Sequence, residues 1–184
     1  MDENRPHETT CTLWSFQTTS ACELLEKTGT LRTDWQLTPI NWRPAYQWMA
    51  AAMERRQILL NGFAPVWAWH SCDGVLQAPP TMGLARDLLT DLQILKGICV
   101  VEMNVPASIC LLSSYQRFND LLDLVLDKGA PIYEDFCDMF EVLLCSPNDS
   151  IQATLPYLDM TWILDIRQID LKPDRWDYDW QKLV

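Results

Sequence analysis

The stretch CTLWSFQ, residues 11–17, decides how the fold begins. Its alternate residues Thr12, Trp14 and Phe16 are types that favour strands, which predicts a β-strand with these three on one face. Shortly after it, Ser20 and Glu23 form the S-x-x-E pattern of a helix N-terminus. The chain therefore opens with a strand that leads directly into a helix.

The remainder of the chain mixes helices and strands without a regular alternation. Helices are predicted over residues 20–29, 41–60, 84–95, 114–128 and 133–145. Strands are predicted over residues 65–72, 98–105 with 108–112 as its short partner, 151–155 and 161–171. After a tail of residues 1–10, we therefore expect residues 11–184 to form one α+β domain with mixed or antiparallel sheets of about six strands and about five helices.

The chain is strongly acidic. Its 184 residues contain 14 Lys and Arg against 25 Asp and Glu, a net charge of -11. Residues 61–184 hold eight of the basic and 18 of the acidic side chains. Nucleic acids and anionic membranes attract basic surfaces, so binding to either is not expected. A basic protein partner is favoured instead, because opposite fields speed encounter.

Seven cysteines and two histidines limit the metal and redox chemistry. The cysteine count is odd, no pair has C-x-x-C spacing, and the N-terminus lacks a signal-peptide pattern. We therefore expect reduced, mostly buried thiols in a cytoplasmic protein. His7 and His70 do not lie at ligand spacing from any cysteine, so no metal site is expected.

No strong catalytic motif is present: the sequence lacks G-x-G-x-x-G, the P-loop pattern, H-E-x-x-H and G-x-S-x-G. Two single residues offer weaker alternatives. His70 suits either proton transfer or a hydrogen-bonded structural role in its strand. Glu102 suits either a half-buried base or an ordinary position at a sheet edge.

Two predicted helices carry acidic stripes opposite apolar ones, and residues 118–149 contain eight acids and one base. A ridge that docks on a basic partner and a solvated face that keeps the protein soluble both fit this pattern. The stripes consist of Asp120, Asp123 and Asp127 on the first helix and Glu134, Asp138 and Glu141 on the second.

The chain also holds nine tryptophans. Trp14 and Trp69 lie in predicted strands, where they suit a core or the walls of a pocket. Trp176, Tyr178 and Trp180 alternate with aspartates near the C-terminus. These three either pack back on the domain or form a docking strip.

Several tryptophan-rich strings resemble domain of unknown function 3841, a bacterial family. They are LWSFQ (13–17), RPAYQWM (43–49), PVWAW (65–69) and IQAT (151–154). The similarity extends over about residues 11–170. The family name implies kinship without implying an activity.

At the level of the fold, the chain is also similar to the ADP-ribosyltransferases, through its opening strand, a helix that ends in Gly-x-Leu and a late pair of strands. The resemblance implies an NAD-binding cleft between two sheets, with a basic or His residue on the first strand and a Glu on a late strand. Gln17 and Gln152 stand near those two positions. An amide cannot stabilise an oxocarbenium-like centre as a carboxylate does, so a degenerate enzyme is one reading.

Two functions therefore stay open at this point. The first is a cofactor-free acidic protein that docks on a basic partner; an inhibitor of a nucleic-acid enzyme, from a phage or mobile element, would fit this description. The second is an NAD-binding protein, active or degenerate. Its pocket would be lined by Trp14, Gln17, Trp69, His70 and Gln152.

Overall fold

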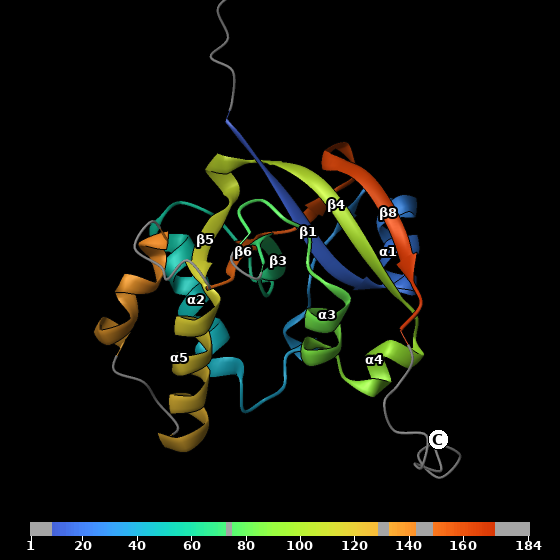
Figure 1. Cartoon of the computed structure of the whole chain (residues 1–184). Coiled ribbons are helices and arrows are strands. Elements are labelled where there is room, and N and C mark those ends of the chain that lie inside the picture. Colours follow the sequence, from blue (N-terminus) through green and yellow to red (C-terminus); the bar gives the residue numbers. More distant parts are fainter. Residues whose placement is uncertain (1–8, 73–74, 129–132, 143–148, 172–184) are drawn as a thin grey trace, which may run out of the picture.

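The computed structural model describes residues 9–72, 75–128, 133–142 and 149–171, with the backbone alone for residues 133–135. These residues form an α+β fold (Figure 1). The described α-helices are α1 (Thr19–Thr28), α2 (Arg43–Arg55), α3 (Met82–Leu88), α4 (Asp91–Leu95) and α5 (Tyr115–Lys128). The described strands are β1 (Thr10–Thr18), β2 (Thr30–Leu31), β3 (Val66–Ser71), β4 (Ile98–Pro106), β5 (Leu111–Ser114), β6 (Ile151–Leu155), β7 (Leu158–Asp159) and β8 (Ile163–Ile169). Short 3-10 helices are η1 (Trp35–Leu37), η2 (Ala107–Ile109), η3 (Tyr133–Phe140) and η5 (Met160–Trp162).

Six strands form an antiparallel sheet in the order β5-β6-β3-β1-β4-β8, while β2 pairs separately with β7. Strand β1 pairs with β4 along its whole length, from Thr10 to Thr18. In contrast, β1 meets β3 at one register pair, Trp14 with Trp69. The sheet therefore consists of two three-stranded halves, β5-β6-β3 and β1-β4-β8, that join at this pair.

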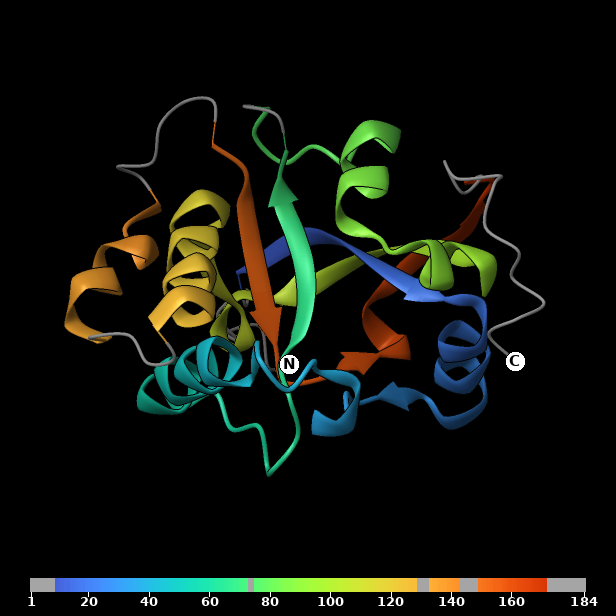
Figure 2. The same ribbon diagram turned by 90° about the horizontal axis from the view of Figure 1, so that it is seen from below.

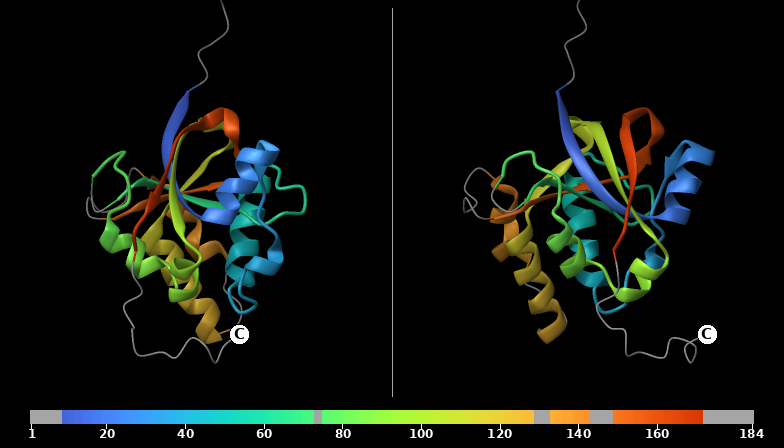
Figure 3. Two further views of the ribbon diagram at one scale, coloured as in Figure 1. Left: turned by 90° about the vertical axis from the view of Figure 1, so that its right-hand side faces the viewer. Right: turned by 45° about the vertical axis from the view of Figure 1, so that its right-hand side comes forward.

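Helices cover both faces of the sheet. On one face, Leu25 of α1 belongs to a core cluster that includes Leu13 and Val101. The opposite face has two helical covers (Figure 2): α2 and α5 pack on the half with β3 and β5, and α3 and α4 pack on the half with β1 and β8. The side views show α1 and the α3–α4 pair on opposite sides of the second half (Figure 3).

Local sequence signals explain where several helices begin and end. The Thr18 hydroxyl accepts a hydrogen bond from the backbone N–H of Ala21 and caps α1. Gly29, with φ of 77°, ends α1 in the left-handed conformation that glycine adopts without steric cost. The predicted cap at Ser20 was therefore placed two residues late. Thr10, predicted as part of the tail, is the first residue of β1.

Three predicted elements differ from the structure. The helix predicted over residues 84–95 is divided into α3 and α4, because Thr90 and Gln93 form a capping box that starts a new helix. The predicted helix over residues 133–145 is the 3-10 helix η3 in its described part. The strand expected at residues 108–112 as the partner of residues 98–105 is β5, which pairs with β6 rather than β4.

Candidate functional site

A row of side chains crosses the sheet where its two halves meet. Register pairs place Trp14 opposite Trp69, Trp69 opposite Gln152, and Gln152 opposite Ser113. Residues directly opposite each other on neighbouring strands point to the same face. These four side chains, the central row, therefore share the face that α2, α3, α4 and α5 cover.

The central row contains polar atoms that the fold leaves without partners. Trp14 is 5% exposed, Gln152 3% and Ser113 0%. Among the described residues, none provides a hydrogen-bond partner for the Trp14 Nε1, the Gln152 Nε2 or the Ser113 Oγ atom. Trp67 lies on the same face of β3, and its buried Nε1 atom also has no hydrogen-bond partner among the described residues. Since more than about 90% of buried polar groups are hydrogen-bonded, this concentration indicates a place for a polar ligand or for ordered water.

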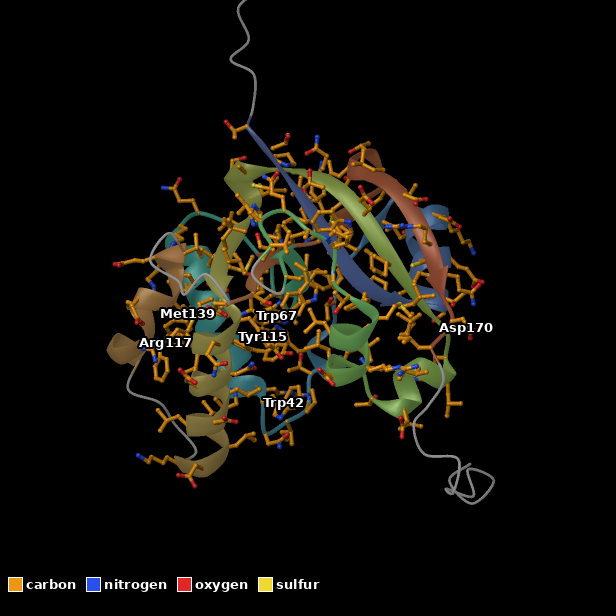
Figure 4. All side chains as sticks on the ribbon, in the orientation of Figure 1. Trp42, Trp67, Tyr115, Arg117, Met139 and Asp170 are labelled. Carbon is orange, nitrogen blue, oxygen red and sulfur yellow. The ribbon has the colours of Figure 1, made fainter. Side chains whose placement is uncertain are left out.

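Aromatic rings lie against the row from the helical side. Tyr115, the first residue of α5, packs edge-on against Trp69 with ring centroids 5.0 Å apart. Next to it, the ring centroid of Trp67 lies 4.5 Å from that of Phe118 and 5.1 Å from that of Tyr46 in α2. Figure 4 shows Trp67 and Tyr115 between α5 and α3. The row is therefore flanked by flat apolar surfaces that suit a planar ring.

His70 follows Trp69 at an irregularity of β3. Trp69 pairs with Gln152 and Ser71 with Ile151, so His70 is an extra residue, and it makes a β-bulge. Its Nδ1 atom lies 2.8 Å from the Ser71 hydroxyl, which also accepts a hydrogen bond from the backbone N–H of Gln77. Burial lowers the pKa of His70. The imidazole is therefore neutral at pH 7. With the proton on Nε2, its Nδ1 atom accepts a hydrogen bond from the Ser71 hydroxyl, which in turn accepts from Gln77.

Gln17 lies away from the central row. It is three positions from Trp14 on the same strand, which places it on the opposite face. Its Nε2 atom donates to the Ser15 hydroxyl at 2.8 Å, and that hydroxyl donates to the Trp67 carbonyl oxygen at 2.7 Å. The structure thus brings Trp14, Trp69 and Gln152 together, with His70 at the neighbouring bulge, and separates Gln17 from them.

Glu102 continues the row on the other side of Trp14. It stands opposite Trp14 in the register of β1 and β4. Because β8 lies beyond β4, this carboxylate is not on an edge strand. Its Oε2 atom is 3.4 Å from the Arg167 guanidinium, which also contacts Asp165 at 3.1 Å. Glu102 is therefore part of an ion-paired group at the β8 side of the sheet.

The predicted acidic stripes meet at Arg117. Its guanidinium contacts Asp120 at 3.2 Å and Asp138 at 3.0 Å, so one cation links the stripes of α5 and η3. The two carboxylates raise the pKa of Arg117, with Asp138 making the larger contribution. Figure 4 shows Arg117 between these two elements. Part of the expected ridge therefore stabilises the packing of η3 on α5.

The other predicted acidic residues differ in their surroundings. Asp123 and Asp127 are exposed on α5, and Glu141 is exposed just after η3. The side chain of Glu134 lies outside the described part of the chain. Asp149, which was not assigned to a stripe, accepts hydrogen bonds from the Ser114 hydroxyl and the Gln116 backbone N–H at the start of α5. Of the predicted stripe residues with exposed side chains and no contact to Arg117, two lie on α5 and Glu141 lies beyond η3.

Two classes of feature are not found in the part of the chain that the structure describes. No group of three or more His, Cys, Asp or Glu side chains is arranged to hold a metal ion there. The same residues include no helix that is long and apolar enough to span a membrane. The aromatic strip predicted at Trp176, Tyr178 and Trp180 lies outside them, as does His7.

Residues 12–126 match the family model described as domain of unknown function (DUF3841). The chain belongs to this family. The match runs from β1 into α5, so the DUF3841 region holds three members of the central row, Trp14, Trp69 and Ser113, while Gln152 follows it. No curated protein and no solved structure matches the chain.

The predicted pocket did not include three residues of this site: Trp67, Ser113 and Tyr115. Trp67 has the same alternation phase as Trp69 in β3, so the strand pattern alone placed it on the correct face. Ser113 and Tyr115 join the row only because β5 pairs with β6 and leads directly into α5. No signal in the local sequence specifies that pairing.

Proposed function

We propose that the central row binds the planar heterocycle of a nucleotide, with NAD as the first candidate. The observation that carries this proposal is the set of buried polar atoms without partners at Trp14, Gln152 and Ser113. A fold gains nothing from such atoms, because each loses its hydrogen bonds to water and obtains none in return. A ligand that accepts hydrogen bonds would restore what each atom lost.

The chemistry of the row indicates which ligand atoms it would bind. The indole N–H of Trp14 and the amide N–H of Gln152 are donors, and the Ser113 hydroxyl can donate as well. The complementary ligand therefore presents acceptors, such as the carbonyl oxygen of a carboxamide or the ring nitrogens of a base. Trp69 and Tyr115 add aromatic surface, which favours a flat ring.

Entry of a ligand would require a small movement, because the row is buried. Tyr115 lies against Trp69 and is only partly buried itself. Rotation of its ring away from Trp69 is the smallest change that would open this part of the row. Side-chain changes of this size are common when proteins bind small molecules.

The same residues favour binding over ADP-ribosyl transfer. From Trp14 to Ser113 the row contains no carboxylate, and Gln152 stands on the late strand where the resemblance implies a glutamate. An amide does not supply the negative charge that stabilises an oxocarbenium-like centre. Glu102, on the far side of Trp14, is held by Arg167. We therefore propose a nucleotide-binding protein that has lost, or never had, transferase chemistry.

Titration of the full chain with millimolar NAD, followed by thermal melting and calorimetry, tests this function. We expect a saturable rise in Tm, because a ligand that binds only the folded state stabilises it. The variant Gln152→Leu should lose this rise while its own Tm is not lowered, because the substitution removes an unpaired polar group.

The matched control is Gln17→Leu, which changes a glutamine on the opposite face of the sheet and should keep the rise in Tm. Parallel titrations with nicotinamide and adenosine identify which ring is bound. The proposal is wrong if the unmodified protein shows no response to any of the three compounds. It is also wrong if Gln152→Leu responds as fully as Gln17→Leu.

A second candidate function rests on the exposed aspartates of α5: docking on a basic protein. Asp123 and Asp127 are one helical turn apart on the solvent side of α5, near Asp120. Such a line of charge would steer a basic partner toward the helix. An inhibitor that occupies the basic surface of a nucleic-acid enzyme would use a surface of this kind.

Charge reversal distinguishes a docking surface from a charged face that only keeps the protein soluble. The double variant Asp123→Lys/Asp127→Lys leaves the Arg117 contacts intact and should abolish low-salt capture of a basic protein from a host lysate. The control Glu23→Lys/Glu26→Lys reverses two exposed charges on α1. Equal capture by both double variants would show that the α5 charges serve solubility alone.

A further inference from the structure

Two pairs of cysteine side chains lie in contact in this fold, at different depths. Cys11 of β1 is hydrogen-bonded to Cys110, which directly precedes β5. Cys22 of α1 is hydrogen-bonded to Cys99 of β4. Both members of the first pair are half-buried, whereas both members of the second are buried, at 4% and 5% exposure. None of the six described cysteines is part of a disulfide.

The backbone explains why Cys11 and Cys110 meet although 99 positions separate them in sequence. Thr9 accepts a hydrogen bond from the backbone N–H of Ala107 at 2.8 Å, which fixes η2 beside the start of β1. Cys110 follows at the end of η2, where its N–H bonds to the Ala107 carbonyl oxygen at 3.3 Å. Both cysteines pack against the same apolar cluster from its rim.

We propose that Cys11 and Cys110 form an oxidation site, in which peroxide converts the two thiols into a disulfide. In the first step the Cys11 thiolate attacks hydrogen peroxide, the O–O bond breaks, and Cys11 becomes a sulfenic acid as hydroxide leaves. In the second step the Cys110 sulfur attacks the Cys11 sulfur and water leaves. Peroxide takes up two electrons in total, and the two cysteines supply them.

The surroundings of the two sulfurs assign them different roles. The hydrogen bond from Cys110 lowers the pKa of Cys11 to about 7, and the same contact raises the pKa of Cys110. Cys11 is thus the thiolate that reacts first, because the thiolate is the nucleophilic form, and Cys110 is the resolving thiol. Burial raises the pKa of Cys22 to about 12, so the second pair should stay reduced.

The oxidised bond would link the start of β1 to the start of β5. These strands carry Trp14 and Ser113 and belong to different halves of the sheet. Because a disulfide that closes a long loop restricts the unfolded chain, we expect the oxidised protein to melt at a higher temperature than the reduced protein. This inference does not depend on the proposed nucleotide site.

Peptide mapping of the full chain after peroxide treatment at pH 7 tests the site. Cys137 and Cys145 are changed to Ser in the background protein, so that the buried Cys72 is the one cysteine left outside the two pairs. We expect a Cys11–Cys110 disulfide in the parent protein. Cys110→Ser should stop at a sulfenic acid on Cys11, which dimedone traps, and Cys11→Ser should give neither product. Cys99→Ser, the matched control at the buried pair, should still form the Cys11–Cys110 disulfide.

A second measurement needs no variant. The rate at which iodoacetamide labels Cys11 in the unmodified, reduced protein should reach half of its maximum near pH 7. The proposal is overturned if that midpoint lies near 9.0, the ordinary value for a thiol, or if peroxide leaves Cys11 and Cys110 reduced in the folded parent protein.

Discussion

Two buried serines, one on each face of the same sheet, differ in their hydrogen bonding. On the face that α1 covers, Ser15 is fully buried, donates to the Trp67 carbonyl and accepts from Gln17. On the other face, Ser113 is equally buried and its hydroxyl has no partner among the described residues. Both serines lie on strands, so strand geometry does not explain the difference. The first face is organised for stability, and the second holds polar atoms that the fold does not use.

The junction between β1 and β3 is the weak point of the sheet. Strands β1 and β3 share a single register pair, so few backbone hydrogen bonds hold the two halves together at their junction. The Ser15 hydroxyl supplies a bond to the β3 backbone close to that pair. This difference between the faces leads to predictions that assign stability to one and ligand binding to the other.

The largest expected change in the free energy of unfolding comes from the apolar cluster on the face that α1 covers. Leu13 is fully buried in the cluster that holds α1 on the sheet. Leu13→Ala should lower the free energy of unfolding by about 2–5 kcal/mol, because it removes buried apolar contacts and leaves a cavity. Urea unfolding measures this loss. NAD should still raise the Tm of this variant, because Leu13 lies on the face opposite the central row. Loss of that rise would contradict the assignment of stability and ligand binding to different faces.

The two buried serines form a matched pair for the next prediction. Ser15→Ala leaves the Trp67 carbonyl and the Gln17 amide without their partner, so it should lower the free energy of unfolding by about 1–3 kcal/mol. Ser113→Ala removes a hydroxyl that has no partner in the ligand-free protein and should change it by less than about 1 kcal/mol. Urea unfolding of both variants measures the contrast. Equal losses would mean that Ser113 has a structural partner after all.

The smallest expected effect concerns pH and the bulge beside the row. Because burial lowers the pKa of His70, the unfolded chain binds a proton more readily than the folded one. Stability should therefore fall as the pH drops below 6.5, the ordinary value for histidine, toward the lowered value. His70→Asn should flatten this decline, measured as Tm between pH 7 and pH 5.5, whereas His7→Asn should not. An unchanged decline in His70→Asn would assign the acid sensitivity to other groups.

Much of the local structure could be predicted from the sequence because its signals act over a few residues. The apolar stripe opposite the first acidic stripe (Phe118, Leu121, Leu122 and Val125) predicted the helix that is α5. Three of these four residues are buried there, and Leu122 is partly buried. The mixture of elements identified the α+β class. The boundary between α3 and α4 was missed, because four-residue leucine spacing continues across the Thr90 cap.

The candidate site was predicted in part for the same reason. Trp14 and Trp69 were identified from their composition and strand position, and the register places them side by side. Gln17 was grouped with them from a resemblance, although its odd spacing from Trp14 already indicated the opposite face. Ser113 and Tyr115 depend on which strand pairs with which, and pairing between distant segments leaves no local trace.

The sequence by itself determined the acidic charge, the lack of a known catalytic motif, the individual helices and strands, and membership of the DUF3841 family. These properties follow from composition, short periodic patterns and strings of letters. Only the tertiary structure decided that Trp14, Trp69, Gln152 and Ser113 form one row, and that Cys11 touches Cys110. Both depend on the register of strands far apart in the chain, which is set by the packing of the whole core rather than by the residues on either side of each strand.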